Sequence, residues 1–418
     1  MNKLKAAILS ITVITACQCA NAQRNEIYSP EIKSLQVVCG DKWLALPIAR
    51  LGDYSEENRI NISFDDLTHT YRRYTYKLTH CEADWTPSEG LFASDFIEGF
   101  SYDNPIDDIA ESINTNVLYT HYKLSLPNDR CRIKLSGNYK LTVLDDETGE
   151  KVLDACFMIL DQQVGVSVGA TTNTDIDTNK EHQQISMLVS YNGLRVTDPE
   201  NQIKTYVLQN RRWDNAKTNV PAQYKTTSGL EWTHNKNLIF DGGNEYHKFE
   251  TLATSHATMG IDRISWDGAN YHAHLFHNTP RTNYLYDEDA NGAFYIRNSD
   301  NIENDITCEY VYVHFTLESQ QKYKEDIYIN GDWTYDKFLP EYKMNYNEEK
   351  KQYEGCVLLK QGYYSYQYLM IDENGQTRIA PTEGNFFQTE NKYQALIYYR
   401  NSSDRTDRLV GYQEIQLK

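Results

Sequence analysis

The sequence lacks an apolar run long enough to cross a bilayer as a permanent helix, which takes about 20 consecutive apolar residues. It is also poor in basic residues, with 41 Lys and Arg against 59 Asp and Glu and a formal net charge of −18. A protein that binds a phosphate backbone needs a positive contact surface, so this balance argues against nucleic acid as a partner. Anionic lipid is disfavoured except at a local basic patch. The compact basic pairs, Arg72-Arg73 and Arg211-Arg212, are expected on solvated strands or turns.

Phosphate-loop and dinucleotide-binding signatures are also missing. The sequence has no GxxxxGK[ST] phosphate loop and no GxGxxG fingerprint. Paired carboxylates occur at Asp65-Asp66 and Asp107-Asp108. Neighbours on a strand face opposite ways, and no other carboxylate is placed opposite these pairs, as glycoside hydrolysis would require. We therefore predict no catalytic residue, no cofactor, no small-molecule substrate and no enzymatic activity.

Two motifs could hold a metal ion, and we interpret both as structural. His272 and His274 would share one face of a strand, whereas His277 would point the other way. No carboxylate or cysteine stands at ligand spacing nearby, which favours ordinary surface histidines. The segment 287–292 matches the first half of an EF-hand loop, but Asn298 occupies the place of the bidentate Glu. A turn is therefore favoured there, and no metal site is predicted.

The N-terminus has the pattern of a signal peptide. Two lysines precede an uncharged apolar run over residues 6–16, and a polar stretch follows. The small-x-small pattern at 20–22 suits cleavage before Gln23, which we favour. Residues 14–17 resemble a lipoprotein box, so lipidation at Cys17 is the alternative. Both predict an exported chain.

Cysteine usage leaves the disulfide pattern open. The cysteines that follow the signal sequence are Cys39, Cys81, Cys131, Cys156, Cys308 and Cys356. They are widely spaced without a CxxC pair, which disfavours structural zinc. An oxidising compartment permits disulfides in several pairings, and small buried hydrophobic thiols are the alternative.

Short runs of alternating apolar and polar residues recur along the chain, as at 139–144, 310–315 and 395–399. This period of two, with β-branched and aromatic residues, predicts strands, and turn signals such as Asn330-Gly331 separate them. The 33 tyrosines also suit strands and wet interfaces. Only 106–116 could form a short helix. We predict an all-β fold of two to three tandem immunoglobulin-like β-sandwiches.

The expected units are a signal peptide at 1–22, a first sandwich at 23–160, a second at 161–315 and a third at 316–418. The third region carries Asn330-Gly331-Asp332-Trp333 and later a Gly-x-Tyr-x-Tyr strand. This layout resembles the glycogen-binding type of carbohydrate-binding module. However, the segment 334–338 lacks the second tryptophan that such modules use as a sugar platform.

Five tryptophans stand near polar or turn residues: Trp85, Trp213, Trp232, Trp266 and Trp333. Aromatic platforms that stack on sugar rings have this setting, and so do core tryptophans at sandwich edges. We favour the core for each of them.

Four unusual blocks occur in order in the first region: ISFDDL at 62–67, HCEADW at 80–85, THYKLSLPN at 120–128 and LSGNY at 135–139. Together they resemble the first domain of the type IX secretion system plug proteins of Bacteroidetes. Blocks at 208–216, 243–246 and 289–292 extend the resemblance over most of the mature chain.

The resemblance implies a non-catalytic, periplasm-facing protein at the inner face of the outer membrane. Its expected partner is a large outer-membrane β-barrel translocon, which it would bind and occlude. No binding residues can be assigned from the resemblance. The alternative is an exported carbohydrate-binding protein that acts through its C-terminal module.

Overall fold

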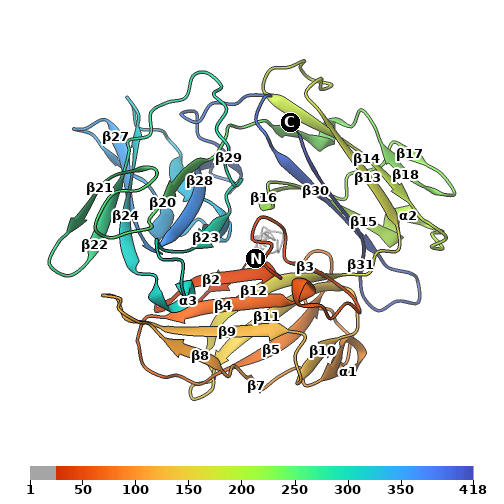
Figure 1. The fold of residues 1–418 in the computed structure, drawn as a ribbon. Helices are drawn as coiled ribbons and strands as arrows, with labels where there is room; N and C mark the ends of the chain where they lie inside the picture. The colour runs from red at the N-terminus through yellow and green to blue at the C-terminus, as the bar shows by residue number, and fades with distance from the viewer. Residues whose placement is uncertain (1–24, 418) are drawn as a thin grey trace, which may run out of the picture.

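The structure is a computed structural model that describes residues 25–417. The expected signal peptide at 1–22 and the alternative lipid anchor at Cys17 lie outside the described residues. No helix within 25–417 is long and apolar enough to cross a membrane. Paired β-sheets build three sandwiches that pack around a common centre (Figure 1). The all-β prediction is confirmed, whereas the immunoglobulin-like topology stays a prediction.

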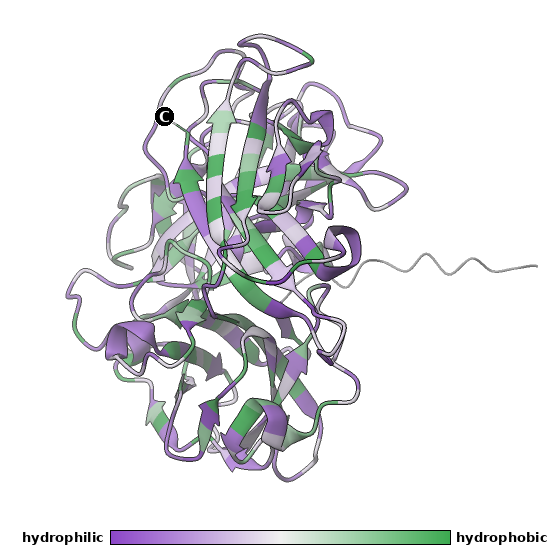
Figure 2. Cartoon of the chain, turned by 90° about the vertical axis from the view of Figure 1, so that its right-hand side faces the viewer, coloured by the Kyte–Doolittle hydropathy of each residue, from purple (hydrophilic) through white to green (hydrophobic). Residues whose placement is uncertain are grey.

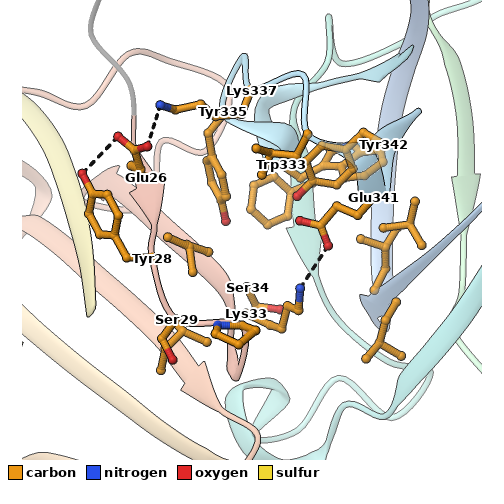
Figure 3. Close-up of a pocket in the computed structure, with 18 of the residues that line it drawn as sticks. Glu26, Tyr28, Ser29, Lys33, Ser34, Trp333, Tyr335, Lys337, Glu341 and Tyr342 are labelled. Carbon is orange, nitrogen blue, oxygen red and sulfur yellow. Dashed lines mark hydrogen bonds and ion pairs between the residues drawn. The ribbon is translucent and has the colours of Figure 1, made fainter. Parts of the chain in front are cut away.

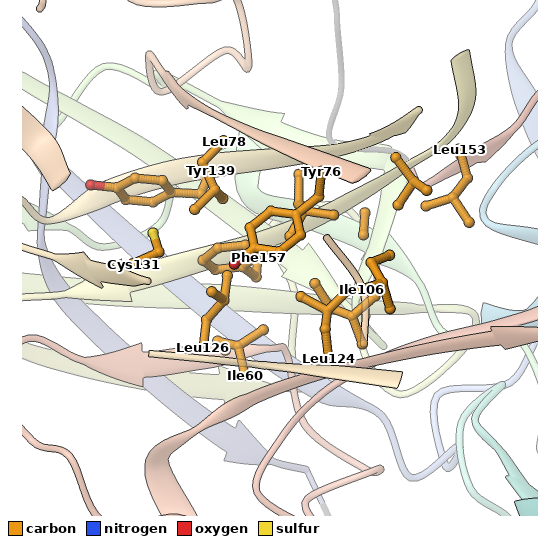
Figure 4. Close-up of a cluster of buried hydrophobic side chains, with 14 of the residues drawn as sticks. Ile60, Tyr76, Leu78, Ile106, Leu124, Leu126, Cys131, Tyr139, Leu153 and Phe157 are labelled. Carbon is orange, nitrogen blue, oxygen red and sulfur yellow. The ribbon is translucent and has the colours of Figure 1, made fainter. Parts of the chain in front are cut away.

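The first sandwich comprises β1 (Glu26–Ile27), β2 (Ile32–Cys39), β3 (Ile48–Arg50), β4 (Ile60–Asp66), β5 (Tyr74–Cys81), β6 (Ile97–Gly99), β7 (Asn104–Pro105), β8 (Asp108–Glu111), β9 (Thr120–Leu126), β10 (Cys131–Ile133), β11 (Gly137–Asp145) and β12 (Lys151–Leu160). One sheet has the order β1-β12-β11-β5-β7, with β3 parallel to β12, and the other has the order β2-β4-β9-β8. The core between the sheets includes Ile60, Tyr76, Leu124, Tyr139 and Phe157 (Figure 4). Alternate residues of each strand supply these side chains, as a period of two dictates.

The expected short helix over 106–116 is wrong, because Asp108–Glu111 form β8 and pair with β9. Pairing with a neighbouring strand overrides the local helical pattern. The helices are single turns: α1 (Ala93–Phe96), α2 (Pro199–Gln202), α3 (Asn304–Thr307), and the 3-10 turns η1 (Glu56–Asn58), η2 (Lys236–Leu238), η3 (Asp332–Thr334) and η4 (Pro340–Tyr342).

The second sandwich comprises β13 (Gly165–Thr171), β14 (His182–Ser190), β15 (Ile203–Gln209), β16 (Arg212–Thr218), β17 (Tyr224–Lys225), β18 (Gly229–Trp232), β19 (Ile239–Asp241), β30 (Lys392–Tyr399) and β31 (Arg408–Gln416). One sheet has the order β13-β14-β18-β17, with β19 also on β14, and the other has the order β16-β15-β30-β31. Side chains from both sheets, including Val189, Trp232 and Tyr393, form one core.

The third sandwich comprises β20 (His247–Glu250), β21 (Ile261–Trp266), β22 (Tyr271–Leu275), β23 (Phe294–Ile296), β24 (Tyr310–Glu318), β25 (Asp326–Asn330), β26 (Asn345–Asn347), β27 (Gln352–Lys360), β28 (Gly362–Ile371) and β29 (Thr377–Ile379). In one sheet β28 pairs with β20, β23, β25 and β29, and the other has the order β21-β22-β24-β27-β26. Phe249, Phe315 and Tyr364 lie in the core between them. Figure 2 shows hydrophobic and hydrophilic residues alternating along the strands.

The sheet pairings divide the chain differently from the expected units 161–315 and 316–418. Residue 315 lies inside β24, and the last two strands, β30 and β31, pair with β15 rather than with the third sandwich. The third sandwich, from His247 to Ile379, is therefore inserted within the second. Local periodicity identifies strands, but pairing across nearly 200 residues leaves no local signal.

Candidate functional site

A buried charge network joins the first sandwich to the third. Asp65 is the penultimate residue of β4. Its carboxylate is buried and accepts hydrogen bonds from Lys360 Nζ at 2.6 Å and Tyr310 Oη at 2.7 Å. His121 Nδ1 lies 2.7 Å from the other carboxylate oxygen. Burial opposes ionisation, but Lys360 and His121 together hold the pKa of Asp65 below its usual range. The Lys360 ammonium also lies over the ring of Tyr119, 4.1 Å from its centroid.

The two carboxylate pairs have structural roles. Asp66 is buried beside Asp65 and accepts a hydrogen bond from Tyr74 Oη at 2.9 Å. Asp107 forms an exposed ion pair with Arg130 at 3.2 Å. Asp65, Asp66 and Asp107 thus each have a partner within their own sandwich or across a junction, which supports the structural interpretation of these carboxylates.

Arg211 lies at the meeting point of all three sandwiches. It sits at the tip of the β15–β16 hairpin, where Asn210 and Arg211 have φ values of 54° and 63°. These left-handed values match the primed turns that hairpins favour. The side chain, only 5% exposed, donates from Nε to Asp332 at 2.9 Å and from a terminal nitrogen to the Leu44 carbonyl at 3.0 Å. The other terminal nitrogen donates to the carbonyls of Ala290 and Asn291.

The expectation that Arg211-Arg212 decorates a solvated turn is therefore wrong. Both side chains are buried, and Arg212 forms a two-pronged ion pair with Asp214 at 2.6 and 3.0 Å. The guanidinium group can donate to several acceptors at once, so its hydrogen bonds offset the desolvation cost at a junction rich in carbonyls. Arg72 and Arg73, in contrast, are 38% and 62% exposed, as predicted.

A fourth hydrophobic cluster fills the junction between the first and second sandwiches. Trp85 and Trp213 pack edge to face with centroids 5.7 Å apart, and Met158, Leu208 and Tyr398 surround them. Polar links complete this junction, because Asp407 accepts from Ala83 N at 3.0 Å and from Lys204 Nζ at 2.7 Å. The sequence blocks that carry the family resemblance thus supply residues to all the junctions.

The other tryptophans largely match the core prediction. Trp232 and Trp333 are 2% and 4% exposed, within the second and third cores, whereas Trp266 is 48% exposed. Trp333 donates its indole N–H to the Ser365 carbonyl at 3.2 Å. A buried, bonded Trp333 cannot offer its face to a sugar ring.

The EF-hand-like segment forms a turn. Asp289 is half-buried and accepts hydrogen bonds from the backbone amides of Asn291 and Tyr246. Burial raises the pKa of Asp289 to about 7. Asp287 pairs with Lys248 at 2.5 Å. The carboxylates therefore shape the loop whose carbonyls receive Arg211.

The histidines of β22 belong to a larger cluster than the sequence indicated. His272 Nδ1 lies 2.8 Å from His314 Nε2, and His274 stacks on His314 with centroids 4.4 Å apart. Cys356 Sγ lies 3.8 Å from His314 Nε2. Strand pairing brings His314 and Cys356 beside β22, and no sequence spacing could reveal this. Within residues 25–417, no three His, Cys, Asp or Glu side chains are grouped so as to hold a metal ion.

Of the cysteines that follow the signal sequence, five are buried and Cys356 is exposed. Burial raises the pKa of Cys131 and Cys308 to about 12. These two thiols are free and behave as small core residues.

A cleft of about 210 Å³ lies between β2 and the segment that follows β25 (Figure 3). Ion pairs cross it between the first and third sandwiches, from Glu26 to Lys337 at 3.0 Å and from Lys33 to Glu341 at 3.1 Å. Tyr335 Oη also donates to the Leu35 carbonyl at 2.9 Å. These ion pairs and this hydrogen bond across the cleft brace the first and third sandwiches against each other.

These features define a class of protein: three β-sandwiches cross-braced into one body, with buried charges committed to the junctions. Residues 32–161 match the family model described as the type 9 secretion system plug protein 1st domain. A crystal structure of a hypothetical protein from Parabacteroides merdae ATCC 43184 is 37% identical, with a TM-score of 0.90, and the match covers 94% of this chain and 99% of that one. The chain belongs to the type 9 secretion system plug protein family.

Family membership indicates a role associated with type IX secretion and a location in the periplasm or cell envelope. No curated protein matches the chain. The C-terminal domain of the Streptococcus agalactiae AgI/II polypeptide BspA aligns over 85% of this chain and 92% of that one, at 8% identity and a TM-score of 0.14. That likeness carries no argument about fold or function.

Proposed function

We propose that this protein is a non-catalytic accessory protein that binds the periplasmic side of a large outer-membrane β-barrel translocon and occludes it. The observation that supports this role most directly is the cross-bracing of three sandwiches by Arg211 and by the Asp65–Lys360 pair. A body that closes an opening sterically has to keep its shape under load. Buried charges that are hydrogen-bonded across the junctions resist relative movement of the sandwiches.

The first sandwich offers a suitable contact surface. Three aromatic side chains within one segment, Phe92, Phe100 and Tyr102, are 72%, 68% and 63% exposed. Large exposed aromatic residues carry much of the energy of protein interfaces. We assign the barrel contact to this aromatic segment, around α1 and the loop between β6 and β7.

The protein acts at the inner face of the outer membrane. Cleavage before Gln23 would leave it held by the barrel alone, whereas lipidation at Cys17 would add a membrane tether. Release on arrival of a substrate or another partner would be a competition between binding states. The carbohydrate-binding alternative has no supporting observation, because Trp333 is buried.

An affinity capture tests the proposal. The tagged mature protein is incubated with detergent-solubilised cell envelopes shown to contain the barrel, and bound proteins are identified by mass spectrometry. We expect one very large outer-membrane barrel at near-stoichiometric amount. Failure to recover a barrel from such envelopes would refute the occluding role.

A variant with Phe92→Ser, Phe100→Ser and Tyr102→Ser should lose the barrel. The control is Tyr224→Ser, which removes a 58% exposed tyrosine from β17 of the second sandwich and should retain it. If the triple variant still captures the barrel as the parent does, the assigned contact surface is wrong although the function stands.

A further inference from the structure

A hollow of about 590 Å³ opens between the second and third sandwiches. Its walls come from β16, β19 and η2 on one side and from β29 with the turn before it on the other. The volume lies within the roughly 300–1,000 Å³ typical of ligand sites. No residue of the occluding surface proposed above lines it.

The charge of this hollow is opposite to that of the chain. Its charged residues are Arg212, Lys217, Lys236 and Arg378 against Asp214 and Asp241. Both arginines already form ion pairs, Arg212 with Asp214 and Arg378 with Glu325. The two lysines have no ion-pair partner among residues 25–417. A net positive hollow on a protein with a formal charge of −18 favours an anionic ligand.

Lys217 is the deeper of the two lysines. Its ammonium lies over the ring of Phe240, 5.2 Å from the centroid. Burial lowers the pKa of Lys217, and Asp241 offsets only part of this effect. An anion bound here would form an ion pair with the partly desolvated Lys217 ammonium, which has no ion-pair partner among residues 25–417.

The hollow also presents unpaired backbone and amide groups. Within residues 25–417, β16 pairs with no strand besides β15, and β29 with none besides β28, so each has one edge without a strand partner. On that edge of β16 the Trp213 amide donates to Asp336 at 3.1 Å. The side-chain oxygen of Asn215 is buried without a hydrogen-bond partner, while its nitrogen donates to Gln209 at 3.2 Å. A buried acceptor without a donor is costly, and an N–H group of a ligand would satisfy it.

We propose that this hollow binds an extended, carboxylate-rich peptide segment that adds as a strand to the free edge of β16. Main-chain groups of the peptide would pair with the strand edge, the usual basis of affinity in strand addition. Its carboxylates would pair with Lys217 and Lys236, and a peptide N–H would reach Asn215. The inference goes beyond the proposed function, because it concerns a second binding site that needs no barrel.

The test uses the full mature protein and a short fluorescent peptide of alternating threonine and glutamate with capped ends. Fluorescence anisotropy gives its affinity at low and physiological salt. We expect saturable binding that weakens as salt rises, since the carboxylate contacts are electrostatic. The double variant Lys217→Gln and Lys236→Gln should bind about tenfold more weakly. The matched control, Lys350→Gln and Lys351→Gln, removes two exposed lysines elsewhere and should bind as the parent does.

Two further probes separate the parts of the proposal without changing the protein. The same peptide with glutamine in place of glutamate should bind much more weakly, and so should a version with N-methylated backbone amides, which cannot pair as a strand. Equal binding of either probe would overturn the proposal, as would unchanged binding by the lysine variant. Full displacement by millimolar inorganic phosphate or free glutamate would assign a small-anion site and would also overturn it. Because no barrel is present, this assay fails or succeeds independently of the capture experiment.

Discussion

The Asp65–Lys360 pair allows a sharp test of the junction between the first and third sandwiches. The side chains are 1% and 2% exposed, and their charged atoms lie 2.6 Å apart. Replacing Lys360 with Met keeps much of the side-chain volume but leaves the buried Asp65 carboxylate without its lysine partner, with only His121 and Tyr310 still bonded to it. Removal of one partner from a buried ion pair typically costs about 3–5 kcal/mol. The Lys360→Met variant also loses the hydrogen bond to the Asp305 carbonyl and the contact with Tyr119.

Urea unfolding of the mature protein at neutral pH measures this cost. We expect Lys360→Met to lower the free energy of unfolding by about 3–5 kcal/mol. The double variant with Asp65→Asn should be more stable than Lys360→Met alone, because no unpaired charge then remains buried. The control is Lys350→Met, which breaks an exposed pair with Glu354 and should cost under about 1 kcal/mol. A Lys360→Met variant within about 1 kcal/mol of the parent would refute the reasoning.

Three further predictions concern stability, pH and thiol reactivity. Arg211→Ala should destabilise the protein by about 3–5 kcal/mol and expose the segments between sandwiches to limited proteolysis, because buried carbonyls and Asp332 lose their donor. An unchanged cleavage pattern would contradict the central role of Arg211. Burial lowers the pKa of His80 to about 4 from an ordinary 6.5, so the unfolded chain takes up its proton first and stability falls as pH drops from about 6.5 toward 4. His80→Gln should show a smaller loss of unfolding free energy between pH 7 and 5, and an equal loss would exclude this histidine as the cause. A thiol reagent should label the native mature protein at Cys356, and Cys356→Ser should abolish that labelling. Persistent rapid labelling would show that a buried thiol is accessible.

Local patterns predicted the strands well and the junctions poorly. Alternation over 310–315 predicted β24, because a strand with one buried face has to alternate. The run at 395–399 predicted β30, although that strand is buried on both faces. Local alternation does not specify which strands pair with one another, so the sequence did not predict that one sandwich is inserted within another. Adjacent arginines such as Arg211-Arg212 are normally solvated. Their burial depends on acceptors supplied by Asp332 and by the loop at Ala290, which only the folded chain brings near.

The residues of the histidine cluster illustrate the same limit. His272 and His274 share a face as their spacing predicted. His314 and Cys356 join them because β24 pairs with β22 in parallel and with β27 in antiparallel. The expectation that no carboxylate or cysteine lies near these histidines is wrong for the folded sheet, because Asp267 lies 3.0 Å from His272 Nε2 and Cys356 lies 3.8 Å from His314 Nε2.

The insertion of the third sandwich has a consequence for the timing of folding. A chain synthesised from its N-terminus completes the first sandwich at β12, but the sheet begun by β15 stays open until β30 and β31 arrive. During that interval β15 exposes an unpaired edge, which is a hazard for aggregation. Arg211 also lacks three of its acceptors, Asp332 and the carbonyls of Ala290 and Asn291, until the intervening sandwich has formed. The last 30 or so residues therefore control when the body becomes rigid, and a chain cut before β30 would keep the first and third sandwiches but lose the second.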